Sequence, residues 1–157
     1  MKTTDLSENP YFGMREQAMS ITPEQLQIET ETELYGIVMD WNMGDFIATV
    51  VSFITGDASV YLSTGQGFIG GYAHETVLNA AENFMLVGER FLSKAEKTED
   101  TEPIIKEGVD FYFLTKSGIF YIEEDFYLIE NGESVYNELF EAGNQVITEY
   151  RLVTDNN

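Results

Sequence analysis

The chain has 157 residues, of which 43 % are hydrophobic and 13 % aromatic, enough for one domain with a buried core. Its formal net charge of −20 argues against nonspecific binding to nucleic acid or to an anionic membrane, because both need a positive surface. The lack of cysteine excludes disulfides, thiol nucleophiles and thiolate metal sites.

The sequence shows no signal peptide and no membrane-spanning segment. The N-terminal residues lack the apolar core of a signal peptide, and no apolar run approaches the roughly 20 residues that a membrane helix needs. We therefore expect a cytoplasmic protein without membrane contact. The predicted organisation is a flexible N-terminal arm over residues 1–10, a single α+β domain over residues 11–152 and a flexible tail over residues 153–157.

Two short helices are predicted at the start of the domain. The first covers residues 11–20. Its apolar side consists of Phe12, Met14, Ala18 and Met19. The second covers residues 23–28, where Thr22 and Gln25 have the spacing of a capping box. Residues 29–33, which are rich in glutamate, then form a charged linker.

Three strands joined by short turns follow. Residues 34–40 alternate with period two, and residues 46–54 are β-branched and aromatic, so both segments are predicted as strands. A tight-turn signal at residues 55–57 returns the chain into a third strand over residues 58–63. The three segments therefore predict an antiparallel meander.

The longest helix is predicted to begin near Tyr72, directly after a run of glycines. Its apolar residues recur at alternating spacings of four and three, which is typical of an amphipathic helix with one buried stripe. The stripe comprises Val77, Ala81, Phe84, Gly88, Phe91 and Ala95, widened by Leu78, Met85 and Leu92. This helix must pack on another element.

The last third of the domain predicts a hairpin and a helix. Residues 109–115 and 119–123 are strands separated by a short turn, so they pair. We expect residues 125–132 to be irregular, although the sequence leaves open a sixth strand there. A final helix is predicted over residues 134–151.

This order of elements predicts an α+β fold in which helices lie on a five-stranded antiparallel sheet. The order resembles that of profilin-like and roadblock-type small domains. The resemblance concerns the order of elements alone, and it implies a fold without implying a function.

The glycine-rich stretch between the meander and the long helix is the first candidate site. Gly65-x-Gly67-x-x-Gly70 matches the dinucleotide fingerprint, but the strand before it ends a meander instead of opening a parallel βαβ unit. We interpret the glycines as residues that permit positive φ and close backbone approach where the chain turns from the sheet edge into the helix, and we expect positive φ at one of them or more. Alternatively, amides at the helix start bind a small anion or nucleotide. The candidate ligand-binding residues are Ser63, Gly65, Gln66, Gly67, Gly70, Gly71, Tyr72 and His74.

No complete catalytic or metal-binding set is recognisable. His74 and Glu75 begin a zinc-protease motif, but Leu78 stands at the position of the second histidine. The turn at residues 40–45 lacks the bidentate glutamate of an EF-hand, because Val51 occupies that position. We therefore predict no catalytic residue, no metal and no cofactor, and we favour a protein that is not an enzyme.

Three aromatic residues are candidates for an interface, since large aromatic side chains are common interface anchors. They are Trp41, for which we expect partial burial, together with Phe126 and Tyr127. The sequence thus favours a non-catalytic acidic interaction or regulatory module that binds a basic protein partner or a second copy of itself, and no nucleic acid. The alternative is a domain that binds a small anionic ligand through residues 63–75.

Overall fold

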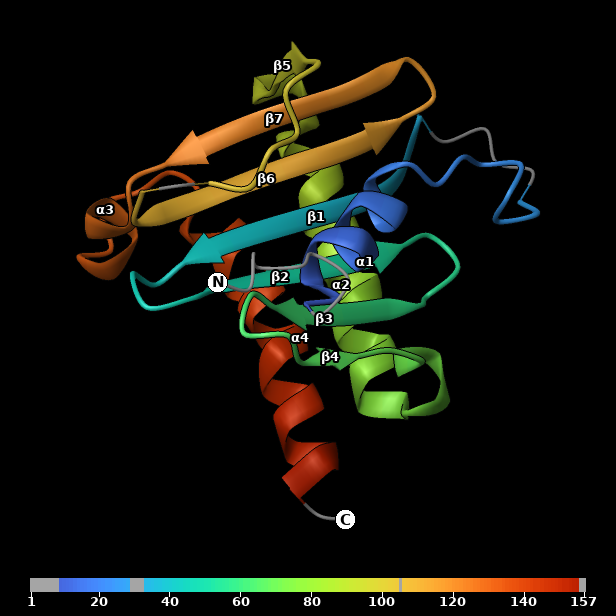
Figure 1. Ribbon diagram of the computed structural model, residues 1–157. Helices are drawn as coiled ribbons and strands as arrows, with labels where there is room; N and C mark the ends of the chain where they lie inside the picture. The colour runs from blue at the N-terminus through green and yellow to red at the C-terminus, as the bar shows by residue number, and fades with distance from the viewer. Residues whose placement is uncertain (1–8, 29–32, 105, 156–157) are drawn as a thin grey trace, which may run out of the picture.

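The computed structural model describes residues 9–28, 33–104 and 106–155, and in it the chain forms an α+β fold around one antiparallel sheet (Figure 1). The strands of the sheet are β1 (Leu34–Asn42), β2 (Ile47–Phe53), β3 (Ala58–Leu62), β4 (Gly67–Phe68), β5 (Glu96–Thr98), β6 (Gly108–Thr115) and β7 (Gly118–Glu124). The helices are α1 (Tyr11–Met19), α2 (Glu75–Phe91), α3 (Phe126–Glu130) and α4 (Asn137–Asp155), with single 3-10 turns η2 (Gly71–Ala73) and η3 (Leu92–Lys94).

The sheet has seven strands in the order β4-β3-β2-β1-β6-β7-β5, so the prediction of five strands is wrong in number. The five predicted strands form its centre, where β1 pairs with β2 on one side and with β6 on the other. The two additional strands, β4 and β5, lie at the edges. They contain two and three residues, too few to produce a recognisable period of hydrophobic residues.

The two long helices, α2 and α4, cover one face of the sheet (Figure 1). Apolar residues at every second position of the strands point to this face, as expected for strands covered on one side. The fully buried residues include Ile37, Met39, Phe84, Phe111, Phe113 and Leu139. Two helix glycines permit close packing, because a Cβ at Gly88 would lie 2.6 Å from Ile37 and a Cβ at Gly143 would lie 2.7 Å from Met39.

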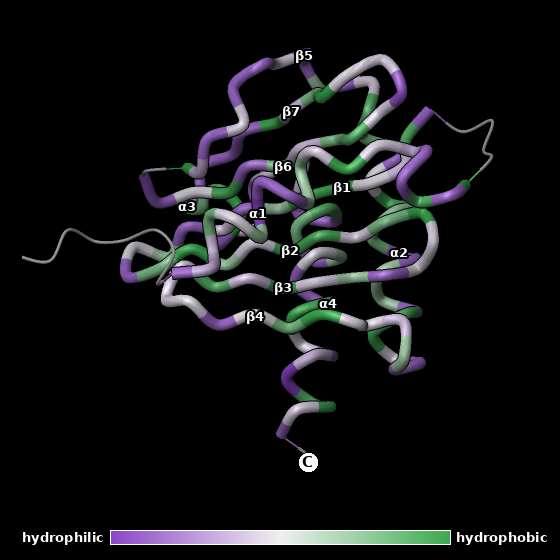
Figure 2. The backbone as a smooth tube through the Cα atoms, turned by 45° about the vertical axis from the view of Figure 1, so that its right-hand side comes forward, coloured by the Kyte–Doolittle hydropathy of each residue, from purple (hydrophilic) through white to green (hydrophobic). Residues whose placement is uncertain are grey.

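The opposite face is covered in part by the nine-residue helix α1 (Figure 1). Its buried residues are Tyr11, Arg15, Ala18 and Met19. The predicted apolar side of this helix is therefore wrong at Phe12, whose side chain is 42 % exposed. The buried side of α1 instead includes the cation Arg15 and the phenol Tyr11. Figure 2 shows that hydrophobic stretches concentrate in the central strands, whereas the peripheral loops are hydrophilic.

Four segments differ from the prediction. The helix predicted to begin near Tyr72 begins at Glu75, after the 3-10 turn η2. Residues 23–28 form turns instead of a helix, although both capping-box hydrogen bonds between Thr22 and Gln25 are present. Gln27 has a φ of 56°, a left-handed conformation that ends the helical path. The stretch after β7 is neither irregular nor a sixth strand, because Asp125 accepts a hydrogen bond from the amide of Tyr127 and caps α3.

The final helix, α4, begins later and ends later than predicted, at Asn137 and Asp155. Its C-terminal turns extend beyond the edge of the sheet (Figure 1). Most of the predicted N-terminal arm and of the glutamate-rich linker lies outside the described residues. Within the described ranges no helix combines the length and the hydrophobicity required to cross a membrane.

Candidate functional site

Three carboxylates lie side by side on neighbouring strands, on the face that carries α1. In the register of the sheet, Asp40 of β1 is opposite Asp110 of β6, and Asp110 is opposite Glu123 of β7. Directly opposed residues share a face, and like charges in that position destabilise a sheet. We refer to Asp40, Asp110 and Glu123 as the carboxylate row. Such a repulsive arrangement needs compensating cations.

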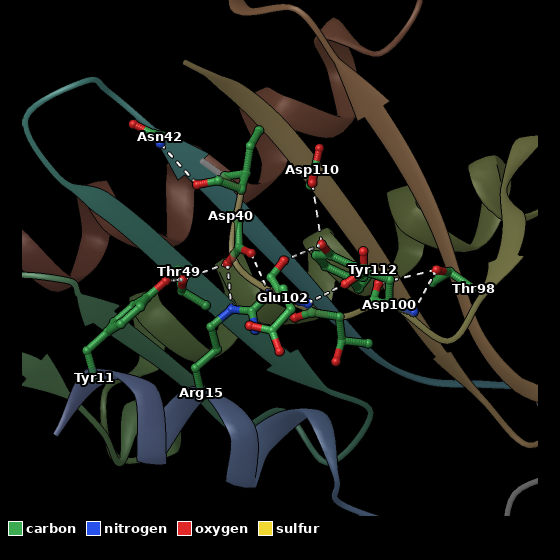
Figure 3. A network of polar contacts seen from close by, with 12 residues as sticks. Tyr11, Arg15, Asp40, Asn42, Thr49, Thr98, Asp100, Glu102, Asp110 and Tyr112 are labelled. Atoms are coloured by element: carbon green, nitrogen blue, oxygen red, sulfur yellow. Dashed lines mark hydrogen bonds and ion pairs between the residues drawn. The ribbon is translucent and has the colours of Figure 1, made fainter. Parts of the chain in front are cut away.

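Asp40 is fully buried and fully compensated (Figure 3). The guanidinium of Arg15, which reaches down from α1, donates to both oxygens, with Nε 3.2 Å from Oδ1 and Nη2 2.6 Å from Oδ2. The hydroxyl of Thr49 donates to Oδ1 at 2.6 Å. Since that hydroxyl has a single proton, the phenol of Tyr11, 2.7 Å away, must donate to it in turn.

Arg15 keeps its charge in this buried pair around neutral pH. Burial opposes the charge on Arg15, but the adjacent carboxylate of Asp40 outweighs burial and raises the pKa of the guanidinium further. Burial, together with the charge of Asp40, raises the pKa of Tyr11 to about 12. Asp40, the first member of the row, is therefore held in an ion pair that connects α1 to the sheet.

The negative charge of Glu123, at the other end of the row, is compensated by a lysine at the surface. The ammonium of Lys106 lies 2.7 Å from its Oε1, and both side chains are largely exposed to solvent. Water and salt screen such a pair, so it holds neither side chain firmly. The second cation of the row is thus mobile in comparison with Arg15.

Asp110, in the middle of the row, is buried and has no ion-pair partner in the part of the chain that the structure describes. Its side chain is only 8 % exposed, and its Oδ1 has no hydrogen-bond partner among the described residues. The phenol of Tyr112 donates weakly to Oδ2, at 3.4 Å, and also to the carbonyl of Glu102, at 3.2 Å. Buried polar atoms are nearly always hydrogen-bonded, so this unused acceptor is an exception in the fold.

The environment of Asp110 disfavours its charge. Burial, and then the charges of Glu123 and Asp40, raises the pKa of Asp110 to about 6, against the smaller opposing effects of Tyr112 and Lys106. The carboxyl group is still mostly ionised at pH 7. Asp110 therefore carries an incompletely compensated negative charge, and perturbed groups of this kind concentrate at functional sites.

A pocket of about 480 Å³ lies over this part of the row. Its described charged lining comprises the carboxylates Asp100, Glu102, Asp110 and Glu123 and the lysine Lys106. Tyr112 and Tyr121 also line it, and these two residues form the next cross-strand pair on the same face of the sheet. The pocket thus combines negative charge with aromatic surface, which is suited to an organic cation. No set of three His, Asp or Glu side chains in the described ranges is arranged to hold a metal ion.

The predicted glycine-rich site lies elsewhere, around edge strand β4 and the start of α2. As predicted, positive φ occurs, at Gly65 (110°) and Gly70 (75°). Gly71 permits a close approach, because a Cβ there would lie 2.6 Å from the hydroxyl oxygen of Tyr150. These observations support the backbone interpretation of those glycines. Binding of a ligand by this stretch stays a prediction.

The polar residues of that stretch have local roles or face solvent. The hydroxyl of Ser63 accepts a hydrogen bond from the amide of Ile47. Tyr72 is exposed. His74 is also exposed and precedes α2 without capping it through its side chain. The carboxylate row lies on β1, β6 and β7, so the structure does not bring the predicted residues and the row together.

The three predicted interface residues separate into two groups. Trp41 is partly buried, as expected, and its ring lies 5.4 Å from that of Phe126 and 5.0 Å from that of Phe140. It therefore belongs to the margin of the core under α3 and α4. Tyr127 is exposed and stays a predicted contact residue.

Sequence reasoning missed Asp110 and Arg15 as functional candidates. A signal for Asp110 exists, since it is the one acid inside the strand predicted over residues 109–115, where all eight residues of β6 are buried. Pairing with Asp40, about seventy residues away in sequence, is not visible without the sheet register. Comparison with protein-family models, with curated proteins and with solved structures finds no significant match, so the geometry of the site carries the functional argument.

Proposed function

We propose that this protein is a non-catalytic binding module that accepts a cationic group of a basic protein partner in the pocket over the carboxylate row. The observation that carries the proposal is Asp110, a buried carboxylate that forms no ion pair with any described residue and whose Oδ1 accepts no hydrogen bond from them. Its two neighbours in the row each have a cation. A cation from a partner would complete the set.

The energetics favour this use of the pocket. An isolated buried charge is costly, and truncating one partner of a buried pair typically costs several kcal/mol because the other charge remains unpaired. A ligand cation beside Asp110 would offset that cost and would also weaken the repulsion along the row. The binding free energy therefore includes a favourable contribution from pairing the charge of Asp110, which forms no ion pair with the described residues of the free protein, and from the weaker repulsion between the carboxylates.

The charge of the whole molecule acts in the same direction. A formal net charge of −20 attracts basic partners over long range and accelerates their association. A basic partner is also what the sequence predicted. The element order that resembles profilin-like and roadblock-type domains adds only a fold-level analogy, which does not carry a function.

The proposal is tested by calorimetric titration of the full chain with a short synthetic peptide that contains lysine and arginine. The variants are Asp110→Asn and, as a matched control, Asp155→Asn at the far end of α4. Both remove one negative charge, so long-range attraction falls equally. We expect Asp110→Asn to weaken binding by at least about tenfold, as truncation at a buried charge pair does, whereas Asp155→Asn binds like the wild type.

Two results would contradict the proposal. Equal weakening in both variants would mean that the peptide responds only to total charge. Absence of binding to the wild type at low ionic strength would mean that the pocket does not accept cations. The melting temperature of each variant, measured in parallel, shows that any loss of affinity is not a loss of fold.

The second function that the sequence predicted, binding of a small anion by residues 63–75, has weaker support. Backbone conformation accounts for Gly65, Gly70 and Gly71, and the overall charge repels anions. A thermal-shift screen with nucleotides and small carboxylates tests it, since a ligand that binds the folded state raises the melting temperature.

A further inference from the structure

This inference rests on the proposed function and names the group that the pocket accepts. We infer that the carboxylate row binds the guanidinium group of an arginine side chain from the partner, in preference to a lysine ammonium. The row already holds one arginine of its own. The surroundings of that arginine show which contacts the sheet offers to a second one (Figure 3).

Arg15 uses three kinds of contact on the row. It donates to both oxygens of Asp40, and its Nη1 donates to the backbone carbonyl of Thr101 at 2.5 Å. Its Cζ lies 5.5 Å from the centre of the Tyr112 ring. A carboxylate, a carbonyl and a ring together match the forked donors and the flat face of a guanidinium.

Two of these contacts recur one strand further along the row. Asp110 provides the carboxylate, next to Asp40 in the register. Tyr121 provides a second ring, opposite Tyr112 on β7, and it is only partly buried. Glu102 also lines the pocket. A carboxylate and a ring like those of the Arg15 site thus lie around Asp110 without an arginine from the described residues.

The forked N–H donors of a guanidinium also fit the spacing of the carboxylates better than the compact charge of an ammonium does. Directly opposed residues in an antiparallel pair have Cβ atoms about 4.5–5.5 Å apart, so Asp110 and Glu123 present two acceptor groups side by side. The five N–H donors of a guanidinium can reach both acceptors at once. An ammonium satisfies one carboxylate well and leaves the other dependent on Lys106.

Desolvation favours arginine as well. Asp110 is buried, so its partner must lose much of its own hydration to reach it. An ammonium is more strongly hydrated than a guanidinium. Lys106 illustrates this preference, because its ammonium remains at the exposed rim beside Glu123.

The test uses three peptides that are identical except for one central residue, which is arginine, lysine or the neutral analogue citrulline. Each is titrated calorimetrically into the wild type, Asp110→Asn and the control Asp155→Asn. We expect the arginine peptide to bind the wild type at least about tenfold more tightly than the lysine peptide, a difference of about 1.4 kcal/mol. The citrulline peptide should bind most weakly.

The variants separate this inference from the proposed function. In Asp110→Asn the preference for arginine over lysine should disappear, whereas Asp155→Asn should keep it. If arginine and lysine bind equally and Asp110→Asn weakens both, the inference is wrong and the proposed function stands. If citrulline binds as well as arginine, both are wrong.

A second variant protects the test against loss of structure at Asp110. Tyr121→Leu removes the aromatic face at a partly buried position of β7 and leaves every carboxylate in place. We expect this variant to lower the affinity for the arginine peptide more than the affinity for the lysine peptide. A guanidinium stacks on a ring, whereas the binding of an ammonium depends mainly on charge. An equal effect on the two peptides would contradict the inferred stacking.

Discussion

The two faces of one sheet are built on different principles. Along β1 the side chains alternate, so Ile37 and Met39 enter the apolar core under α2 and α4, whereas Val38 and Asp40 face α1. The first face is held by the burial of large apolar side chains. The second places an ion pair, two further carboxylates and several phenols beneath or beside a short helix.

This difference separates the part of the sheet that provides stability from the part proposed to bind a partner. Burial of apolar area stabilises a fold by about 25 cal/mol per Å², and it needs no particular partner. A buried ion pair is weak evidence for stability, because desolvation offsets most of its attraction. A row of carboxylates in the sheet thus adds little to stability, which is consistent with its proposed use in binding.

The largest effect is expected on the apolar face. Phe84 is fully buried between α2 and the sheet, so Phe84→Ala should lower the free energy of unfolding by about 3–5 kcal/mol, the range for truncating a buried aromatic ring. Urea denaturation followed by circular dichroism measures the change.

Two further positions on α2 calibrate that result. Phe91 is only partly buried, so its truncation to alanine should cost clearly less than that of Phe84. Leu86 is 64 % exposed, and Leu86→Ala should change stability by less than about 0.5 kcal/mol. A loss at Leu86 as large as at Phe84 would mean that α2 does not face the sheet as described.

The second effect is expected at the ion pair on the other face. Arg15→Met keeps most of the apolar stem but leaves Asp40 buried without a cation, which should cost about 3 kcal/mol. Urea denaturation of the variant and of the wild type measures the loss. A loss that is not reduced when Asp40 is neutralised as well would mean that packing of α1, and not charge, causes it.

A double variant sharpens the comparison of the two faces. Replacing Asp40 with asparagine in the Arg15→Met background removes the unpaired charge, so it should restore much of the stability. No compensating replacement of this kind exists for Phe84, where the loss comes from a cavity.

The part of the fold that sequence predicted is the part that periodicity controls. Each of the five central strands contains five or more residues, and the buried residues of α2 recur with helical spacing, as at Val77, Ala81 and Phe84. Strands β4 and β5 were missed because two or three residues cannot show a period. The capping box at Thr22 formed its hydrogen bonds, yet no helix followed, since a single turn of helix is unstable by itself.

The candidate site could not be predicted for a different reason. Its geometry depends on the pairing of β1 with β6, which brings Asp40 and Asp110 together across a long stretch of intervening chain. Local sequence around Asp110 shows an acid within an aromatic strand, but not what lies opposite it. Arg15 gave no signal, because α1 places a charged residue on its buried side.

The third prediction concerns stability and pH at Asp110. Its pKa is raised from 3.8 to about 6 in the folded protein, so the folded state binds this proton more tightly than the unfolded state. The contribution is therefore present at low pH and is lost as pH rises from about 4 through about 6. The groups that set the shift are Glu123, Asp40, Tyr112 and Lys106.

Asp110→Asn removes this unfavourable ionisation. The rise in the pKa of Asp110 from 3.8 to about 6 corresponds to about 3 kcal/mol. Solvent at the pocket mouth reduces this value, so we expect a gain in stability of about 1–2 kcal/mol at pH 7. The gain should vanish near pH 4. Denaturation measured across this pH range checks the prediction, and a variant less stable than the wild type at pH 7 would contradict it.

A smaller loss is expected at the edge of the sheet. Gly70 has a φ of 75°, and a Cβ there would contact nothing within 4 Å, so Gly70→Ala tests backbone conformation alone. We expect it to lower the free energy of unfolding by about 1 kcal/mol, because alanine is strained in the left-handed region. An unchanged melting curve would contradict the backbone interpretation at this position.

The smallest effect, and one of opposite sign, is expected at Gly13 in the middle of α1. Gly13 has ordinary helical φ, is exposed, and would place a Cβ in open space. Glycine inside a helix is less favourable than alanine by about 0.5–1 kcal/mol, so Gly13→Ala should raise the free energy of unfolding by that amount. Denaturation and peptide titration on the same variant check it.

Since α1 holds Asp40 through Arg15 but leaves Asp110 unpaired, this variant should be more stable with unchanged affinity for the arginine peptide. Weaker binding would mean that α1 must move for the pocket to accept a cation. The Arg15–Asp40 ion pair and the pocket at Asp110 would then change conformation together.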